Sequence, residues 1–161
     1  MMQRDNIKIK NMDFNEIPYV AEMEKRCFSL CAWTERMFVN VFNDRSENIM
    51  LSAYYEDRLA GYIVMGICLD EAEIQVLAVD EMFRRKGIAE KLIDHAEELI
   101  SGRVERIFLE VRENNDAARK LYEKKGFEVT GMRKNYYRDN SGNPPENAVL
   151  MTRFLKIGDN V

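Results

Sequence analysis

A short basic segment leads directly into an amphipathic stretch at residues 84–89. It reads Arg-Arg-Lys-Gly-Ile-Ala, and the helix predicted to follow is strongly amphipathic. The first amides of a helix have no carbonyl partner within it, and the helix dipole adds partial positive charge there. Gly87 and the small Ala89 would let the backbone approach a phosphate closely. These features indicate an anion site, and several amides at one place suit a pyrophosphate.

The alternative is a solvated basic turn ahead of an ordinary surface helix, because one glycine after basic residues is a weak signal. The segment contains neither the G-x-G-x-x-G pattern of dinucleotide-binding proteins nor the G-K-[ST] of a P-loop. These residues alone therefore allow both interpretations, an anion site and a solvated turn.

Glu110 is the second candidate, because it interrupts the apolar run Ile107–Val111 that is predicted as a buried strand. A buried carboxylate is costly unless it is paired, hydrated or used in chemistry. Burial could raise its pKa toward neutrality and make it a general base, acting directly or through a water. The alternative is that Glu110 lies near an exposed strand end and faces solvent.

Tyr122 is the third candidate, and it lies in a helix predicted over residues 114–125. A phenol with a pKa of about 10 could protonate a leaving thiolate, whose conjugate acid has a pKa of about 8.5. Leu121 and Tyr122 could equally be core anchors, and the residues alone do not separate the two roles. Asn115 could be the N-cap of the same helix, and Gly126 its C′ residue.

Local patterns predict the elements that must position these side chains. Strands are predicted at residues 7–10, 49–55, 59–69, 73–79, 106–111, 127–132 and 148–155, and helices after Asp13, with Glu16 as capping-box partner, and at 34–43, 88–100 and 114–125. Residues 80–86 are expected to be irregular. The third helix is expected to bury one face formed by Ile88, Ala89, Leu92, Ile93, Ala96, Leu99 and Ile100.

The element order is therefore β-α-α-β-β-β-α-β-α-β-β. The helical crossover from strand 73–79 to strand 106–111 implies a locally parallel pair. We expect a single α/β domain over residues 1–161, with a mixed, mostly antiparallel central sheet and helices on both faces.

Composition limits the function classes. The 161 residues carry 24 basic and 28 acidic side chains, a net charge of −4, so bulk nucleic-acid binding is not expected. The three cysteines, Cys27, Cys31 and Cys68, are interpreted as small apolar residues, since a single histidine, His95, cannot complete a metal site with them. With neither a signal peptide nor an apolar run of ~20 residues, a cytoplasmic location is expected.

The stretch from Val79 to Ala89 resembles the acetyl-CoA motif of the GNAT superfamily of N-acetyltransferases. That motif reads R/Q-x-x-G-x-G/A, and Arg84, Gly87 and Ala89 fill it. The resemblance implies acetyl-CoA as cosubstrate and a GNAT-like fold. It implies cofactor contacts from the backbone of Leu77, Ala78 and Val79, and from Arg84, Arg85, Lys86, Gly87, Ile88, Ala89, Glu90 and Asn115.

A closer resemblance, over about residues 7–155, is to ribosomal-protein-alanine N-acetyltransferases. It is carried by residues 27–38, 74–79, 109–115, 118–127 and 133–137. Two departures are Ala32, where that family usually has proline, and Glu146-Asn147-Ala148 in place of E-D-A. The resemblance implies Glu110 as general base and Tyr122 as general acid. Trp33, Tyr136 and Tyr137 would line a peptide groove, although the two tyrosines could instead be ordinary strand packing.

The expected reaction is direct transfer of an acetyl group within a ternary complex, without an acetyl-cysteine intermediate. The expected acceptor is a protein N-terminus, specifically the N-terminal alanine of a small-subunit ribosomal protein. Other enzymatic possibilities are acetylation of lysine side chains or of a small amine. Rivals of other classes are a non-catalytic CoA-binding regulatory module and a subunit that works mainly by binding a partner. No metal, nucleic-acid or membrane partner is expected, and the protein should be a monomer or weak dimer.

Overall fold

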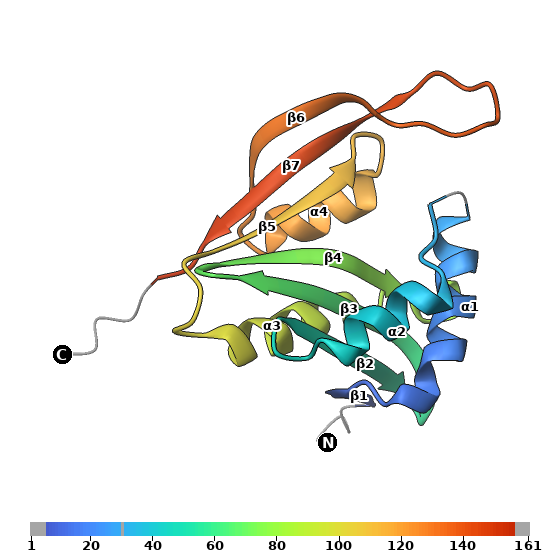
Figure 1. Cartoon of the computed structure of the whole chain (residues 1–161), viewed down its shortest axis with the longest axis vertical. Coiled ribbons are helices and arrows are strands. Elements are labelled where there is room, and N and C mark those ends of the chain that lie inside the picture. Colours follow the sequence, from blue (N-terminus) through green and yellow to red (C-terminus); the bar gives the residue numbers. More distant parts are fainter. Residues whose placement is uncertain (1–5, 30, 157–161) are drawn as a thin grey trace. The chain divides into compact units, whose positions relative to one another are not determined.

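The computed structural model describes residues 6–29 and 31–156. Its element order matches the predicted one, apart from two added short 3-10 helices (Figure 1). The elements are β1 (Ile7–Asn11), η1 (Phe14–Glu16), α1 (Ile17–Phe28), α2 (Glu35–Asn43), β2 (Asn48–Tyr55), β3 (Arg58–Cys68), β4 (Glu71–Val79), η2 (Glu81–Phe83), α3 (Ile88–Ile100), β5 (Arg106–Arg112), α4 (Asp116–Lys124), β6 (Glu128–Tyr137) and β7 (Glu146–Phe154).

The strands form a seven-stranded sheet in the order β1-β2-β3-β4-β5-β7-β6. β1 with β2, β2 with β3, β5 with β7 and β6 with β7 pair antiparallel. β4 and β5 pair parallel, with Glu71 opposite Arg106 and Glu73 opposite Phe108. The mixed α/β fold and the parallel pair predicted from the helical crossover are therefore confirmed.

The chain divides into two compact units, and β3 and β4 run through both. The first unit comprises Met1–Gly66 and Val76–Ile100, and the second comprises Ile67–Gln75 and Ser101–Val161. The first five and last five residues of the predicted 1–161 domain lie outside the described part of the chain.

In the first unit, helices cover both faces of the strands because side chains alternate along β3. Tyr62 and Val64 belong to a buried cluster with residues of α1 and α2. Gly61 faces the other way, toward Ile88 of α3. A β-carbon on Gly61 would come within 2.7 Å of the Ala78 carbonyl oxygen, so only glycine fits beside the end of β4.

The first two helical segments begin where they are predicted, because capping depends on nearest neighbours in the chain. Asp13 and Glu16 form a capping box ahead of α1, and the Thr34 side chain accepts a hydrogen bond from the Met37 N–H. Glu16 is also buried, and its carboxylate accepts hydrogen bonds from Ser52 and Tyr54 of β2. Residues on the neighbouring strand therefore stabilise this cap.

Four details differ from the sequence-based expectations. Leu99 is 45% exposed and not part of the buried face of α3, because it lies at the edge of the apolar stripe. Residues 80–86 contain the short helix η2 and are not wholly irregular. β6 extends to Tyr137, five residues beyond the predicted end, because it pairs with β7 beyond the apolar run. All three cysteines are free thiols, but Cys31 and Cys68 are exposed and so do not pack as the small apolar residues that were predicted.

Candidate functional site

The link from β4 to α3 begins with a turn that Asp80 organises. The Asp80 carboxylate accepts a hydrogen bond from the Met82 N–H at 3.1 Å and pairs with Arg26 of α1 at 2.7 Å. The hydrogen bond from Arg26 lowers the pKa of Asp80. Asp80 N–H donates to the carbonyl of Ala60 at 2.8 Å. The start of the loop is therefore attached to both β3 and α1.

The predicted anion site, residues 84–89, has an unusual backbone. Arg85 and Gly87 both have positive φ angles, of 62° and 81°. The first helical hydrogen bond runs from the Lys91 N–H to the Gly87 carbonyl, so the amides of Ile88 and Ala89 lie ahead of it. A β-carbon on Gly87 would meet nothing within 4 Å. Backbone amides at a helix N-terminus, with no side chain in the adjoining open space, suit a phosphate. This geometry is compatible with the predicted anion site.

The basic side chains of this loop have distinct partners. Arg84 Nε donates to the carbonyl of Val79 at 3.2 Å, so this arginine also shapes the loop. Lys86 Nζ lies 4.9 Å from the centre of the Tyr55 ring. Both side chains are exposed at the surface. Their predicted contacts with a cofactor stay predictions.

Glu110 lies in the middle of β5, in the second unit. Burial alternates along this strand, with Leu109 and Val111 buried and Glu110 between them on the less buried face. The predicted buried strand is therefore fully buried on one face only, because sequence does not show what covers each face. The side chain of Glu110 is 18% exposed and forms an ion pair with Arg133 of β6 at 3.0 Å. The sequence leaves pairing open but does not indicate that Arg133 is the partner.

Glu73 is a candidate that the sequence interpretation passed over. It lies opposite Phe108 in the parallel β4–β5 pair, so Glu73 and Glu110 project from the same face as diagonal neighbours. Burial raises the pKa of Glu73, the negative charge of Glu110 raises it further, and Arg133 opposes the shift. The guanidinium of Arg133, which is ion-paired with Glu110, therefore also acts electrostatically on Glu73. A charged residue within a predicted strand was the available signal, but its neighbour follows only from the strand register.

Tyr122 is 7% exposed, and its ring packs edge-on against Phe127 at 5.6 Å. Burial raises the pKa of its phenol, and the nearby Tyr137 raises it further. The core-anchor interpretation therefore holds, and it does not exclude catalysis. A phenol with a raised pKa keeps its proton at neutral pH and can donate a hydrogen bond to a thiolate. Complete proton transfer is less favourable than an unshifted pKa would imply.

Replacing Tyr122 with phenylalanine should lower kcat roughly 10²-fold or more, with little loss of stability, because it removes only the hydroxyl. The melting temperature, followed by circular dichroism, should stay within a few degrees of wild type. Thiol release under single-turnover conditions measures the chemical step. A single-turnover rate within a factor of about two of wild type would leave Tyr122 with a packing role only.

Tyr136 and Tyr137 lie at the end of β6, with ring centroids 5.1 Å apart. The guanidinium of Arg133 lies 5.3 Å from the Tyr136 ring centre, and that of Arg112 lies 4.3 Å from the Tyr137 ring centre. Tyr136 is 48% exposed. The second unit therefore links the exposed Tyr136 to Glu110 through Arg133, and places the half-buried Tyr137 close to Tyr122.

The unusual Asn147 has a structural explanation. Its Nδ2 donates to the Glu113 carboxylate at 2.9 Å, and its Oδ1 accepts from the Asn135 N–H at 2.9 Å. An aspartate could accept from Asn135 but could not donate to Glu113. The neighbouring Glu146 accepts from the Asn114 N–H at 3.0 Å. The start of β7 thus holds the segment before α4, where Asn115 caps the helix by accepting from the Ala118 N–H at 3.2 Å.

Trp33 belongs to the first unit, just ahead of α2. Its ring packs against Phe38 at 5.3 Å, and its backbone N–H donates to the buried Glu24 carboxylate at 2.9 Å. The predicted cofactor residues 77–79 and 84–90 also lie in the first unit, whereas Glu110, Tyr122, Asn115, Tyr136 and Tyr137 lie in the second.

Metal-binding groups and membrane-spanning helices bear on the function class. Residues 6–29 and 31–156 contain no cluster of three or more histidine, cysteine, aspartate or glutamate side chains arranged to hold a metal ion. Within the same ranges, the helices are too short or too polar to cross a membrane.

The fold and the strand–loop–helix segment define an acyltransferase class, and sequence comparison agrees. The sequence profile of the Acetyltransferase (GNAT) family matches residues 17–127, and the chain belongs to this family. It is therefore an acetyltransferase, as predicted from the motif at residues 84–89.

Individual proteins and solved structures resemble this chain over most of its length. The chain is 34% identical over 144 residues to a [ribosomal protein bS18]-alanine N-acetyltransferase of Salmonella typhimurium, covering 89% of this chain and 94% of that protein. It superimposes on the crystal structure of the ribosomal-protein-S18-alanine N-acetyltransferase from Escherichia coli with a TM-score of 0.84 and 27% identity, covering 96% and 98% of the two chains. Arabidopsis thaliana NAA60 in complex with acetyl-CoA shares the fold, with a TM-score of 0.81, 20% identity and coverage of 92% and 98%.

Proposed function

We propose that this protein transfers the acetyl group of acetyl-CoA to the N-terminal α-amine of a protein, most specifically to the N-terminal alanine of a small-subunit ribosomal protein. The likeness to the Salmonella typhimurium [ribosomal protein bS18]-alanine N-acetyltransferase over 94% of that protein carries the acceptor assignment. In this proposal the two units act together as one N-acetyltransferase domain.

The donor site is proposed at residues 84–89 and the end of β4. The amides of Ile88 and Ala89 would receive the pyrophosphate, and Gly87 would allow its close approach because no side chain intervenes. The backbone of Leu77 and Val79 would hold the pantetheine arm and polarise the thioester carbonyl. When bound, acetyl-CoA supplies an activated acyl group with a thiolate as leaving group.

The proposed chemistry is a direct transfer. The Glu110 carboxylate takes a proton from the acceptor ammonium, and the neutral nitrogen attacks the acyl carbon as the carbon–sulfur bond breaks. Tyr122 donates its hydroxyl proton to the departing sulfur, so that CoA leaves as the thiol. The phenolate then regains a proton as the nitrogen loses its second proton and becomes an amide nitrogen. Arg133 holds Glu110 in place, while Tyr136 and Trp33 offer exposed or half-buried aromatic surface to a peptide.

An Ala-initiated peptide should react faster than the same peptide with a blocked N-terminus and one internal lysine. The α-amine has a pKa near 8 and lysine one near 10.4, so deprotonating lysine at neutral pH costs about 3 kcal/mol more. Free-thiol release at saturating acetyl-CoA measures both rates, and mass spectrometry identifies the acetylated nitrogen. A blocked peptide without lysine provides the background rate. Equal rates for the two substrates would contradict the acceptor assignment and favour a lysine or small-amine acetyltransferase.

A further inference from the structure

The buried cluster of the first unit contains a carboxylate that the proposed chemistry does not use. Glu24 of α1 is 1% exposed, among apolar side chains that include Met23 and Phe38. Burial raises the pKa of Glu24, and hydrogen bonds from Trp33 and Tyr62 oppose the shift. A carboxylate in such surroundings is costly unless donors satisfy it, so its retention requires a reason.

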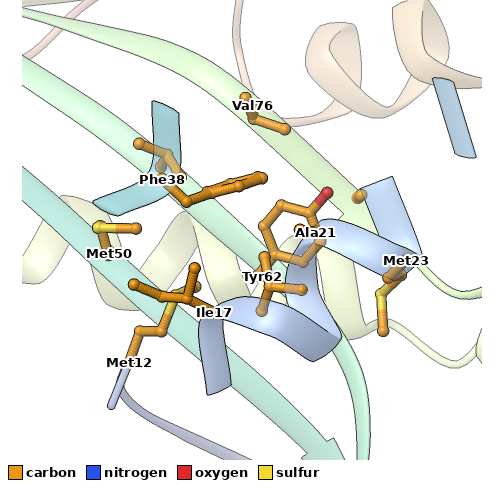
Figure 2. Close-up of a cluster of buried hydrophobic side chains, with 11 residues drawn as sticks. Met12, Ile17, Ala21, Met23, Phe38, Met50, Tyr62 and Val76 are labelled. Carbon is orange, nitrogen blue, oxygen red and sulfur yellow. The ribbon is translucent and has the colours of Figure 1, made fainter. Parts of the chain in front are cut away.

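Its two oxygens bind two different parts of the unit. Oε1 accepts from the backbone N–H of Trp33 at 2.9 Å, and Oε2 accepts from the hydroxyl of Tyr62 on β3. Tyr62 is fully buried, and Figure 2 shows its ring beside that of Phe38 within the cluster. Glu24 therefore connects the segment at residues 31–34, here called the Trp33 segment, to a rigid strand.

Aromatic packing completes the same connection. The Phe38 ring lies 5.7 Å from Tyr62 and 5.3 Å from Trp33, so Trp33 is held by its backbone through Glu24 and by its ring through Phe38. Thr34, the next residue, caps α2 and fixes the other side of the segment. Yet Ala32 and Trp33 are only half-buried, so part of the segment still faces outward.

We propose that Glu24 is a positioning residue for the acceptor: it holds the Trp33 segment in the position in which it can contact the incoming peptide. The inference rests on the proposed function, in which Trp33 lines the acceptor groove. Glu24 itself does not touch the acceptor. A charged acceptor of two hydrogen bonds suits this role because charge-assisted bonds are stronger than neutral ones.

Glu24→Gln tests the proposal with almost no change in shape. The amide can keep one bond to the Trp33 N–H, but the charge is lost and its NH₂ group now faces the Tyr62 hydroxyl. We expect the KM for an Ala-initiated peptide to rise about fivefold to tenfold, equivalent to ~1–1.4 kcal/mol. The Kd for acetyl-CoA should stay within a factor of about two. Tyr62→Phe, which removes one donor to the same carboxylate, should shift the KM in the same direction.

Trp33 is the only tryptophan in the chain, so its fluorescence reports on this segment alone. We expect red-shifted emission and stronger acrylamide quenching in Glu24→Gln. The matched control is Glu16→Gln. Glu16 is also buried, and its carboxylate accepts hydrogen bonds from the Asp13 N–H, Ser52 and the hydroxyl of Tyr54. This control should leave both the Trp33 emission and the peptide KM unchanged.

The outcomes separate this inference from the proposed function. Wild-type emission and peptide KM in Glu24→Gln would overturn the positioning role, as would an equal rise of KM in the Glu16→Gln control. Shifted emission without a change in peptide KM would also overturn it, because the segment would then move without consequence for the acceptor. Failure of the proposed function would appear differently, as absent turnover of the Ala-initiated peptide by the wild-type protein.

Discussion

Gly87→Asp should weaken acetyl-CoA binding by roughly 100-fold or more, equivalent to at least ~2.7 kcal/mol, while the protein stays folded. Gly87 has a φ of 81°, and a side chain there would enter open space beside the start of α3. That space is where the pyrophosphate is proposed to lie. A carboxylate would occupy it and repel the phosphates, and juxtaposed like charges cost several kcal/mol. Isothermal titration with acetyl-CoA measures the loss.

Gly102→Asp is a matched control for backbone strain. Gly102 has a φ of 78°, and a β-carbon there would also meet nothing within 4 Å. It lies in the turn after α3, far along the sequence from residues 84–89. Both variants therefore gain the same charge and a similar strain, but only Gly87→Asp should lose acetyl-CoA. Titration of Gly87→Asp indistinguishable from that of Gly102→Asp would refute the proposed donor site.

Glu110→Gln should lower kcat by roughly 10²–10⁴-fold at pH 7, the range typical of general-base catalysis. The glutamine retains the shape of Glu110 but cannot take a proton. The defect should shrink as pH rises above 8, because more of the α-amine is then already neutral. A pH series of kcat for the Ala-initiated peptide measures this, with the wild-type series as reference.

Glu73→Gln provides the comparison for Glu110. Because the pKa of Glu73 is raised, the folded state holds this proton more tightly than the unfolded state does. Its ionisation therefore lowers stability as pH rises above the ordinary glutamate range, so Glu73→Gln should not lower the melting temperature at pH 7. We expect a smaller loss of kcat than in Glu110→Gln. The reverse ranking of the two variants would assign the base to Glu73 and contradict the assignment to Glu110.

Local chemistry made much of this protein predictable from its sequence. The caps at Asp13 and Thr34 and the C′ position of Gly126 each depend on residues within one helical turn, so the sequence alone contained their signals. The parallel β4–β5 pair followed from the helical crossover that joins the two strands. The glycine-containing loop ahead of α3 also indicated the family from sequence alone, because the residues of its motif are contiguous in the chain.

Contacts between distant segments could be decided only by the tertiary structure. Glu110 and Arg133 act on the pKa of Glu73 because β4 pairs with β5 in one particular register, and no local pattern specifies that register. The amide of Asn147 bonds to both Glu113 and Asn135, which the fold brings to it from other segments. Glu24 lies in α1, and no local pattern shows that its carboxylate is buried. Its burial depends on Tyr62 and Trp33, which the folded chain brings to it from β3 and from the segment before α2.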